Sequence, residues 1–136
     1  MCGIAGLLGN GSLEEAISMA SVIGHRGPDG SGDFLANVEQ ADGSVAFSHA
    51  RLSIIDLDGS HQPIHSDHGC VLMVNGEIYN HQKIKSTLRD YPFRTAGDSE
   101  VIMALHRKYS WNRPVGENPA ERHIEWVSKL DGMWGF

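Results

Sequence analysis

The second residue of the chain is a cysteine, and its position makes two kinds of chemistry available at one place. Once the initiator Met1 is removed, Cys2 carries both a thiol and a free α-amine. An α-amine has a pKa of about 7.7–8.0 and a cysteine thiol one of about 8.5, so the amine can accept the thiol proton without a histidine. Cys2 can therefore act as nucleophile and base together. A cysteine considered alone is more often a small buried hydrophobe, and the rest of the sequence must distinguish the two roles.

Five sequence blocks with chemically useful side chains follow one another in a definite order. They are residues 1–6 (MCGIAG), 26–32 (RGPDGSG), 49–56 (HARLSIID), 74–81 (VNGEIYNH) and 97–101 (GDSEV). In this order the blocks resemble the class II glutamine amidotransferase domain of glutamine-hydrolysing asparagine synthetases. The resemblance extends from residue 2 to about residue 105 and resumes over residues 130–136. It implies that glutamine is hydrolysed to glutamate and ammonia.

The resemblance also implies which residues carry out the hydrolysis. Cys2 would attack the side-chain amide of glutamine and form a thioester. Asn75 and Gly76 match the family's oxyanion hole, in which a side-chain N–H and a backbone N–H face the developing negative charge. For an isolated Asn-Gly pair, an ordinary hairpin turn is the commoner explanation.

Four charged residues and one glycine match the family's binding pocket. Arg51 matches the residue that holds the α-carboxylate of glutamine, a task suited to its planar fork of donors. Glu77 and Asp98 match the acceptors for the α-ammonium, while Arg26 and Gly27 would shape the pocket beside the nucleophile. Each charge considered alone is more simply a solvated surface group or a helix cap.

Two further patterns suggest ligands, but neither fits a known site well. The glycine-rich loop at residues 24–32 follows a predicted helix rather than a strand and lacks the Gly-Lys-Ser/Thr ending of a phosphate-binding loop. His61, His65, His68 and Cys70 have donor atoms for zinc, yet their spacing is irregular and no second cysteine pair accompanies them. We therefore expect no metal, and no cofactor for the glutaminase reaction.

Composition and charge exclude several classes of partner. Hydrophobic residues make up 40% of the chain, as in globular proteins, and 11 basic against 17 acidic residues give a net charge of -6. No basic run offers the footprint that nucleic acids require, and no stretch approaches the ~18 apolar residues of a membrane span. With two cysteines and no secretory signal, we expect a cytoplasmic protein that binds neither nucleic acid nor membrane.

Hydrophobic spacing and turn residues predict a mixture of strands and helices that must position these side chains. The expected strands are residues 2–8, 34–35, 45–49, 52–55, 70–74 and 133–136. The expected helices are residues 13–23 after the capping box Ser12–Glu15, one starting at Asn80, one capped by Asp98 or Ser99, and residues 118–130. Residues 110–117 are expected to form a loop. An α+β fold follows, and the resemblance specifies it as the N-terminal-nucleophile hydrolase αββα sandwich, two antiparallel sheets between helical layers.

The chain is expected to be only part of its protein. Residues 1–136 would be the N-terminal part of a type 2 glutamine amidotransferase domain, incomplete at its C-terminus. The resemblance implies a parent chain whose C-terminal synthetase domain, with ATP and Mg, uses the ammonia to convert aspartate to asparagine. A homodimer of this parent is a further expectation. The alternatives are an amidotransferase that feeds a different acceptor and a non-catalytic glutamine-binding regulatory module.

Overall fold

A computed structural model describes residues 1–38, 43–111 and 119–136. Its elements in chain order are β1 (Gly3–Gly9), α1 (Leu13–Val22), the 3₁₀ helix η1 (Gly24–Arg26), β2 (Gly30–Val38), β3 (Gly43–Arg51), β4 (Ile64–His65), β5 (Val71–Leu72), β6 (Asn75–Ile78), α2 (His81–Thr87), α3 (Glu100–His106), the π-helical η3 (Arg107–Trp111), α4 (Pro119–Val127) and β7 (Gly132–Gly135).

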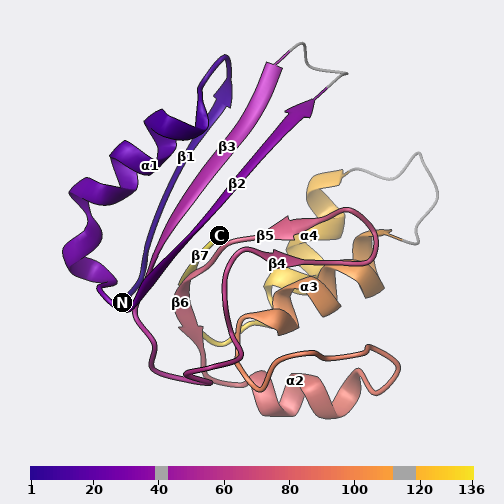
Figure 1. Ribbon diagram of the computed structural model, residues 1–136. Coiled ribbons are helices and arrows are strands. Elements are labelled where there is room, and N and C mark those ends of the chain that lie inside the picture. Colours follow the sequence, from indigo (N-terminus) through magenta and orange to yellow (C-terminus); the bar gives the residue numbers. More distant parts are fainter. Residues whose placement is uncertain (39–42, 112–118) are drawn as a thin grey trace.

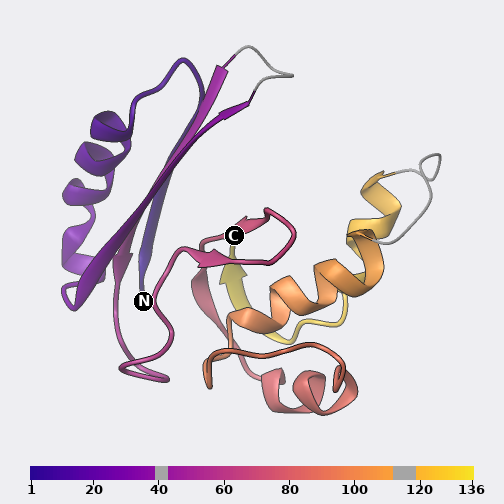
Figure 2. The same cartoon turned by 45° about the vertical axis from the view of Figure 1, so that its right-hand side comes forward.

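Antiparallel strands build the two inner layers of the molecule. One sheet has the order β1-β3-β2, and two further pairs are β4-β5 and β6-β7. Helix α1 covers one face of the three-stranded sheet, the two strand pairs lie on its other side, and α2, α3 and α4 lie beyond them (Figures 1 and 2). This mixed architecture with antiparallel sheets confirms the predicted fold class.

Helix α1 forms where the sequence predicted it. The Ser12 side chain accepts from the Glu15 backbone N–H, and the Glu15 carboxylate accepts from the Ser12 backbone N–H. This capping box satisfies two donors that a helix start leaves without partners. The helix buries Ala16 and Ala20, and their small side chains allow it to approach the sheet closely.

A hydrophobic core lies between the strand pairs and helices α2, α3 and α4. Its members are buried apolar residues of these elements and of the segments that adjoin them: Ile64, Leu72, Val74, Ile78, Ile84, Leu88, Val101, Ile102, Met103, Ala104, Leu105 and Trp126. Helix α3 is buried along all of its first six residues, as expected for a helix enclosed on every side rather than lying at the surface.

The predicted strand at residues 52–55 is wrong. Its backbone donors bind side chains instead of a neighbouring strand: the Leu52 N–H faces the Cys2 sulfur at 3.3 Å, and the Ser53 N–H donates to the Asp29 carboxylate at 2.8 Å. The chain then bends through Asp56, whose φ of 53° is incompatible with a strand. Residues 52–60 therefore form a loop, named here the 52–60 loop.

The hairpin turn that is the commoner explanation of an isolated Asn-Gly pair does not form at Asn75-Gly76, because both residues begin β6 and pair with Gly135 and Trp134 of β7. The side-chain caps expected for two helices do not form either. Asn80 stands before α2, but its side chain bridges Lys129 and Asp131, and Asp98 accepts from the Ile78 backbone N–H instead of capping α3. Long-range partners replace the local ones in all three cases.

The expected loop at residues 110–117 falls mostly outside the described residues. The predicted helix over 118–130 and the strand over 133–136 are confirmed as α4 and β7. In the part of the chain that the structure describes, no helix has both the length and the apolar character needed to cross a membrane.

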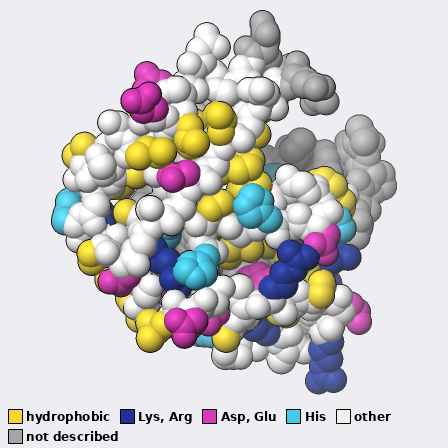
Figure 3. Space-filling view, in the orientation of Figure 1, with side chains coloured by type: hydrophobic (Ala, Val, Ile, Leu, Met, Phe, Trp, Pro, Cys, Tyr) yellow, Lys and Arg dark blue, Asp and Glu magenta, His cyan; other side chains and the backbone are white. Residues whose placement is uncertain are grey.

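Hydrophobic side chains gather over the upper part of the three-stranded sheet (Figure 3). Between this sheet and the strand pairs lies a cavity of about 410 Å³, lined by residues that are mostly apolar: Ile4, Ala5, Gly6, Phe47, Val71, Leu72, Met73 and Phe136.

Candidate functional site

Five of the eight site residues predicted from the sequence line one pocket. Cys2, Arg51, Gly76, Glu77 and Asp98 surround a space of about 60 Å³, named here the Cys2 pocket. The fold brings them together because β1 runs antiparallel to β3, so the residue before β1 meets the last residue of β3. Strand β6 and the residues preceding α3 supply the opposite wall.

Backbone and side-chain contacts fix the position of Cys2. The Leu52 N–H faces its sulfur at 3.3 Å, and the Arg26 Nε donates to its carbonyl oxygen at 3.1 Å. Arg26 thus lies behind the nucleophile rather than in the pocket lining. Met1 also lines the pocket, and while it is present its peptide bond occupies the Cys2 amine.

Two glycines of the predicted site allow close backbone approach. A Cβ on Gly27 would overlap with the Ala50 carbonyl of β3, and a Cβ on Gly76 would overlap with the Met133 carbonyl of β7. Glycine is therefore required at both positions for the strands and η1 to pack as they do.

Asn75 lies next to the pocket, at the start of β6, but it is not among the residues that line it. Its Oδ1 atom is buried and makes no hydrogen bond to any residue that the structure describes. The amide is thus not committed to holding the fold together. Its predicted oxyanion role stays a prediction.

Val74, the residue before Asn75, is held by two side chains for which the sequence predicted no role. Val74 stands between β5 and β6, so neighbouring strands do not pair with its peptide groups. The Gln62 side chain accepts from the Val74 N–H at 2.5 Å and donates to the Val74 carbonyl at 3.2 Å, and His49 Nε2 contacts the same carbonyl at 3.1 Å. No local pattern could reveal this clamp, because Gln62 is 12 residues from Val74 and His49 is 25 residues away.

His49 is fully buried, and burial is the main reason that its pKa lies below the ordinary value of 6.5. The contact with the Val74 carbonyl opposes this shift, whereas the nearby Arg51 charge adds to it. A neutral ring that carries its proton on Nε2 can donate to the Val74 carbonyl.

Charged groups of both signs face the Cys2 pocket. Arg51 is 7% exposed, and two of its N–H groups donate to the carbonyls of Asp56 and Leu57, at 3.0 and 3.1 Å. Asp98 is 8% exposed and accepts from the Ile78 N–H at 2.7 Å, which fixes its carboxylate against β6. One guanidinium and the two carboxylates of Glu77 and Asp98 therefore surround a thiol, an arrangement that complements a small zwitterion.

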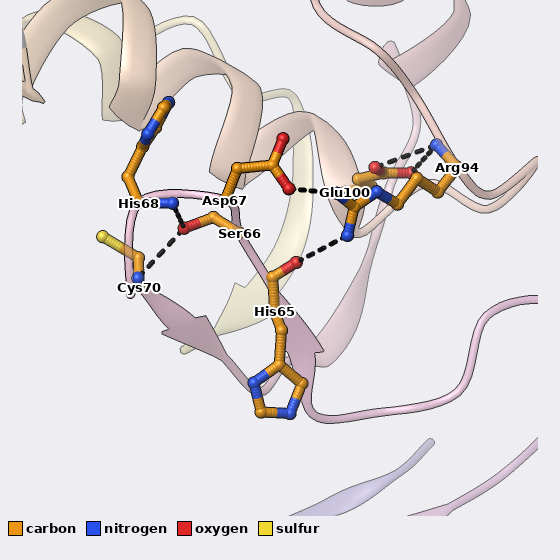
Figure 4. Close-up of polar contacts among 7 residues, drawn as sticks. All are labelled: His65, Ser66, Asp67, His68, Cys70, Arg94 and Glu100. Carbon is orange, nitrogen blue, oxygen red and sulfur yellow. Dashed lines mark hydrogen bonds and ion pairs between the residues drawn. The ribbon is translucent and has the colours of Figure 1, made fainter.

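The histidine-rich segment forms a separate region around the β4-β5 hairpin. Arg94 pairs with Asp67 and donates to the His65 carbonyl, while Glu100 accepts from the Arg94 backbone N–H (Figure 4). The side chains of His65, His68 and Cys70 point in different directions (Figure 4). Among the described residues, no group of three or more His, Cys, Asp or Glu side chains is placed to hold a metal ion.

Comparison with known proteins finds a family model and relatives that match this chain. A family model described as the glutamine amidotransferase domain matches residues 1–136. Asparagine synthetase [glutamine-hydrolyzing] 2 of Oryza sativa subsp. japonica is 37% identical over 142 residues, covering 100% of this chain and 21% of that protein. Asparagine synthetase B [glutamine-hydrolyzing] of Escherichia coli (strain K12) is 34% identical over 125 residues, covering 90% of this chain and 19% of that protein. The chain spans about a fifth of the length of these relatives.

A solved structure is similar over almost the whole chain. It is that of the allosteric regulatory enzyme of purine biosynthesis, with a TM-score of 0.72 and 20% sequence identity, covering 98% of this chain and 34% of the other. At this identity the likeness shows the fold alone, which is the predicted fold of N-terminal-nucleophile hydrolases.

Proposed function

Because this chain belongs to the glutamine amidotransferase domain family, we propose that it forms the glutaminase site of a glutamine-hydrolysing asparagine synthetase. The observation that carries the proposal is the Cys2 pocket. It joins a position-2 cysteine, an arginine and two carboxylates that are up to 96 residues apart in the sequence. Residues 1–136 would be the N-terminal part of a type 2 glutamine amidotransferase domain.

The proposed reaction begins after Met1 is removed. The Cys2 amine accepts the thiol proton, and the sulfur attacks the side-chain carbonyl carbon of glutamine. The Asn75 side-chain N–H and the Gly76 backbone N–H stabilise the negative oxygen of the tetrahedral intermediate. The C–N bond then breaks, ammonia leaves with the proton, and water cleaves the thioester to give glutamate and the free thiol.

Substrate selection follows from the charges around the pocket. Arg51 binds the α-carboxylate, and Glu77 and Asp98 accept from the α-ammonium. A glutamine inside a peptide has neither charged group. It would leave the buried Arg51 and Asp98, and the half-buried Glu77, without charged partners, which disfavours its binding. Arg26 and Gly27 position Cys2 and the adjoining backbone and do not contact the substrate.

The fate of the ammonia is proposed from the relatives. These are longer proteins named as asparagine synthetases, so we propose a following synthetase domain that uses ATP and Mg to amidate aspartate. We further propose a cytoplasmic location, in keeping with two free cysteines, and a homodimer of the parent protein. Transfer to another acceptor is the alternative, which product analysis with aspartate and ATP would distinguish.

The proposed site is tested with 6-diazo-5-oxo-L-norleucine, an electrophile that mimics glutamine. In the natural full-length protein that contains residues 1–136, the intact mass should show loss of Met1 and a single addition, which peptide mapping places at Cys2. Glutamate release from glutamine should disappear with the addition. The matched control is Cys70→Ser, which should leave labelling and turnover unchanged because Cys70 lies outside the Cys2 pocket.

Three results would contradict the proposal: labelling at Cys70 alone, a retained Met1 in an active preparation, or a protein that binds glutamine without hydrolysing it. The last result would favour the regulatory-module alternative.

A further inference from the structure

Two loops form the charge-bearing walls of the Cys2 pocket, and one aspartate joins them. The 52–60 loop lies against the Arg51 guanidinium, which donates to the Asp56 carbonyl at 3.0 Å and to the Leu57 carbonyl at 3.1 Å. The segment of residues 94–98 ends in Asp98. The Asp56 carboxylate accepts from the Ala96 backbone N–H of this segment at 2.9 Å.

Several hydrogen bonds hold the Asp56 carboxylate between the two loops. The Ser60 hydroxyl donates to the Asp56 carboxylate at 2.8 Å, and the Gly97 backbone N–H is a further donor to it. A Cβ on Gly97 would overlap with the Ser60 hydroxyl, so a larger residue would displace the hydroxyl that donates to the Asp56 carboxylate. These hydrogen bonds, with the one from Ser60 contributing most, lower the pKa of Asp56 below its ordinary value of 3.8.

The far side of the 94–98 segment is also held. The buried Glu100 carboxylate accepts from the backbone N–H groups of Arg94 and Thr95, and Lys85 donates to the Thr95 carbonyl at 2.9 Å. Glu100 and Lys85 thus fix the segment to α3 and α2, whereas Asp56 connects it to the opposite wall of the pocket.

Resting on the proposed function, we infer that Asp56 is a positioning residue that sets the distance between the carboxylate-binding Arg51 and the ammonium-binding Asp98, and so determines the selectivity of the pocket for free glutamine. Its carbonyl oxygen meets the arginine, and its carboxylate meets the backbone two residues before Asp98. A charged group at each end of a zwitterion binds well only when the two partners are held at the matching separation.

The test is Asp56→Asn in the natural full-length protein. Asparagine tolerates the positive φ of this position as well as aspartate does, but it loses the charge and presents an NH₂ group to backbone donors. Loss of charge-assisted hydrogen bonds should raise KM for glutamine about tenfold, with kcat changed less than about twofold because the nucleophile and oxyanion donors are untouched. The matched control is Asp58→Asn, an exposed aspartate of the same loop, which should leave both constants unchanged.

A second measurement separates positioning from general damage to the fold. Asp56→Asn should slow labelling of Cys2 by 6-diazo-5-oxo-L-norleucine, which carries both α groups, but not by iodoacetamide, which carries neither. If Asp56→Asn does not fold, Ser60→Ala removes one bond to the same carboxylate and should raise KM by about two- to tenfold.

The remaining outcomes distinguish a wrong assignment of Asp56 from a wrong proposed function. An unchanged KM in the variant, or equal slowing of both electrophiles, overturns the assignment of Asp56 while leaving the glutaminase intact. An unsubstituted protein that does not hydrolyse glutamine overturns the proposed function itself, and the assignment of Asp56 with it.

Discussion

Arg51 and Asn75 both belong to the predicted site, yet the structure surrounds them differently. The Arg51 guanidinium already donates to two loop carbonyls, whereas Asn75 Oδ1 is buried and has no partner among the described residues. A side chain that is already hydrogen-bonded before glutamine arrives contributes to substrate binding and to the shape of the pocket. An amide that holds no part of the fold is suited to act on charge that develops during the reaction.

Replacing Asn75 by alanine should therefore affect the rate more than substrate binding. Loss of one oxyanion donor is expected to lower kcat about 10²- to 10³-fold, with little change in KM. Steady-state glutamate release measures both constants, and Asn37→Ala, an exposed position on β2, is the control. A rise in KM with kcat unchanged would remove Asn75 from the oxyanion hole.

Replacing Arg51 by lysine should act mainly on binding. Lysine keeps the charge but loses the fork of donors, and with it the bidentate contact to a carboxylate and the bonds to Asp56 and Leu57. We expect KM for glutamine to rise about tenfold or more, while the exposed control Arg89→Lys leaves it unchanged. An unaltered KM would show that another residue holds the α-carboxylate.

Among the elements, the junction of β5 and β6 is held in an unusual way. The chain passes there from one strand pair to another, and the side chain of Gln62 replaces the missing strand neighbour of Val74. Because Asn75 and Gly76 follow directly, this clamp fixes the backbone from which the proposed oxyanion donors extend.

Gln62→Leu should destabilise the protein and slow the reaction together. It leaves the buried Val74 N–H without its partner, at a cost of about 1–3 kcal/mol in the free energy of unfolding, and it frees the start of β6 to move. Urea unfolding and kcat measure the two effects, with the exposed Gln82→Leu on α2 as control. A destabilised variant with undiminished kcat would limit Gln62 to a purely structural role.

At the scale of the whole molecule, the buried His49 and the half-buried His106 link the stability of the fold to pH. The pKa of His49 and that of His106 are lowered from 6.5, in both cases mainly by burial, with His123 adding to the effect at His106. In the unfolded chain both rings take up a proton near pH 6.5, so the unfolded state binds more protons than the folded state just below that pH.

The free energy of unfolding should therefore be greatest above pH 6.5 and should fall as the pH is lowered through 6.5 toward 5. The lowered carboxyl pKa values, those of Glu15 and Asp56, act at more acidic pH, below their ordinary values of 4.5 and 3.8. Urea unfolding at a series of pH values measures the slope, which His106→Gln should reduce and the exposed His25→Gln should not. A flat profile between pH 7.5 and 5 would show that neither the His49 ring nor the His106 ring resists protonation.

Local sequence signals by themselves determined several parts of this protein. The capping box Ser12–Glu15 located α1, apolar runs located β1, β5 and β7, and the motif in each of five blocks indicated the family. Each of these signals lies within a few residues, where capping, hydrophobic spacing and motif chemistry operate, so no knowledge of the fold is needed to read them.

Only the tertiary structure decided where the backbone of the pocket obtains its partners. The Leu52 N–H faces the Cys2 sulfur and not a strand, Asn75-Gly76 begins a strand because β7 pairs with it, and Asp98 binds the Ile78 N–H and not its own helix. The roles of Gln62 and of Asp56 depend on contacts that span 12 and 40 residues. The physical reason is the same throughout: a polar group buried by the fold takes whichever partner the packing of distant elements brings to it, and the sequence near that group does not record which one this is.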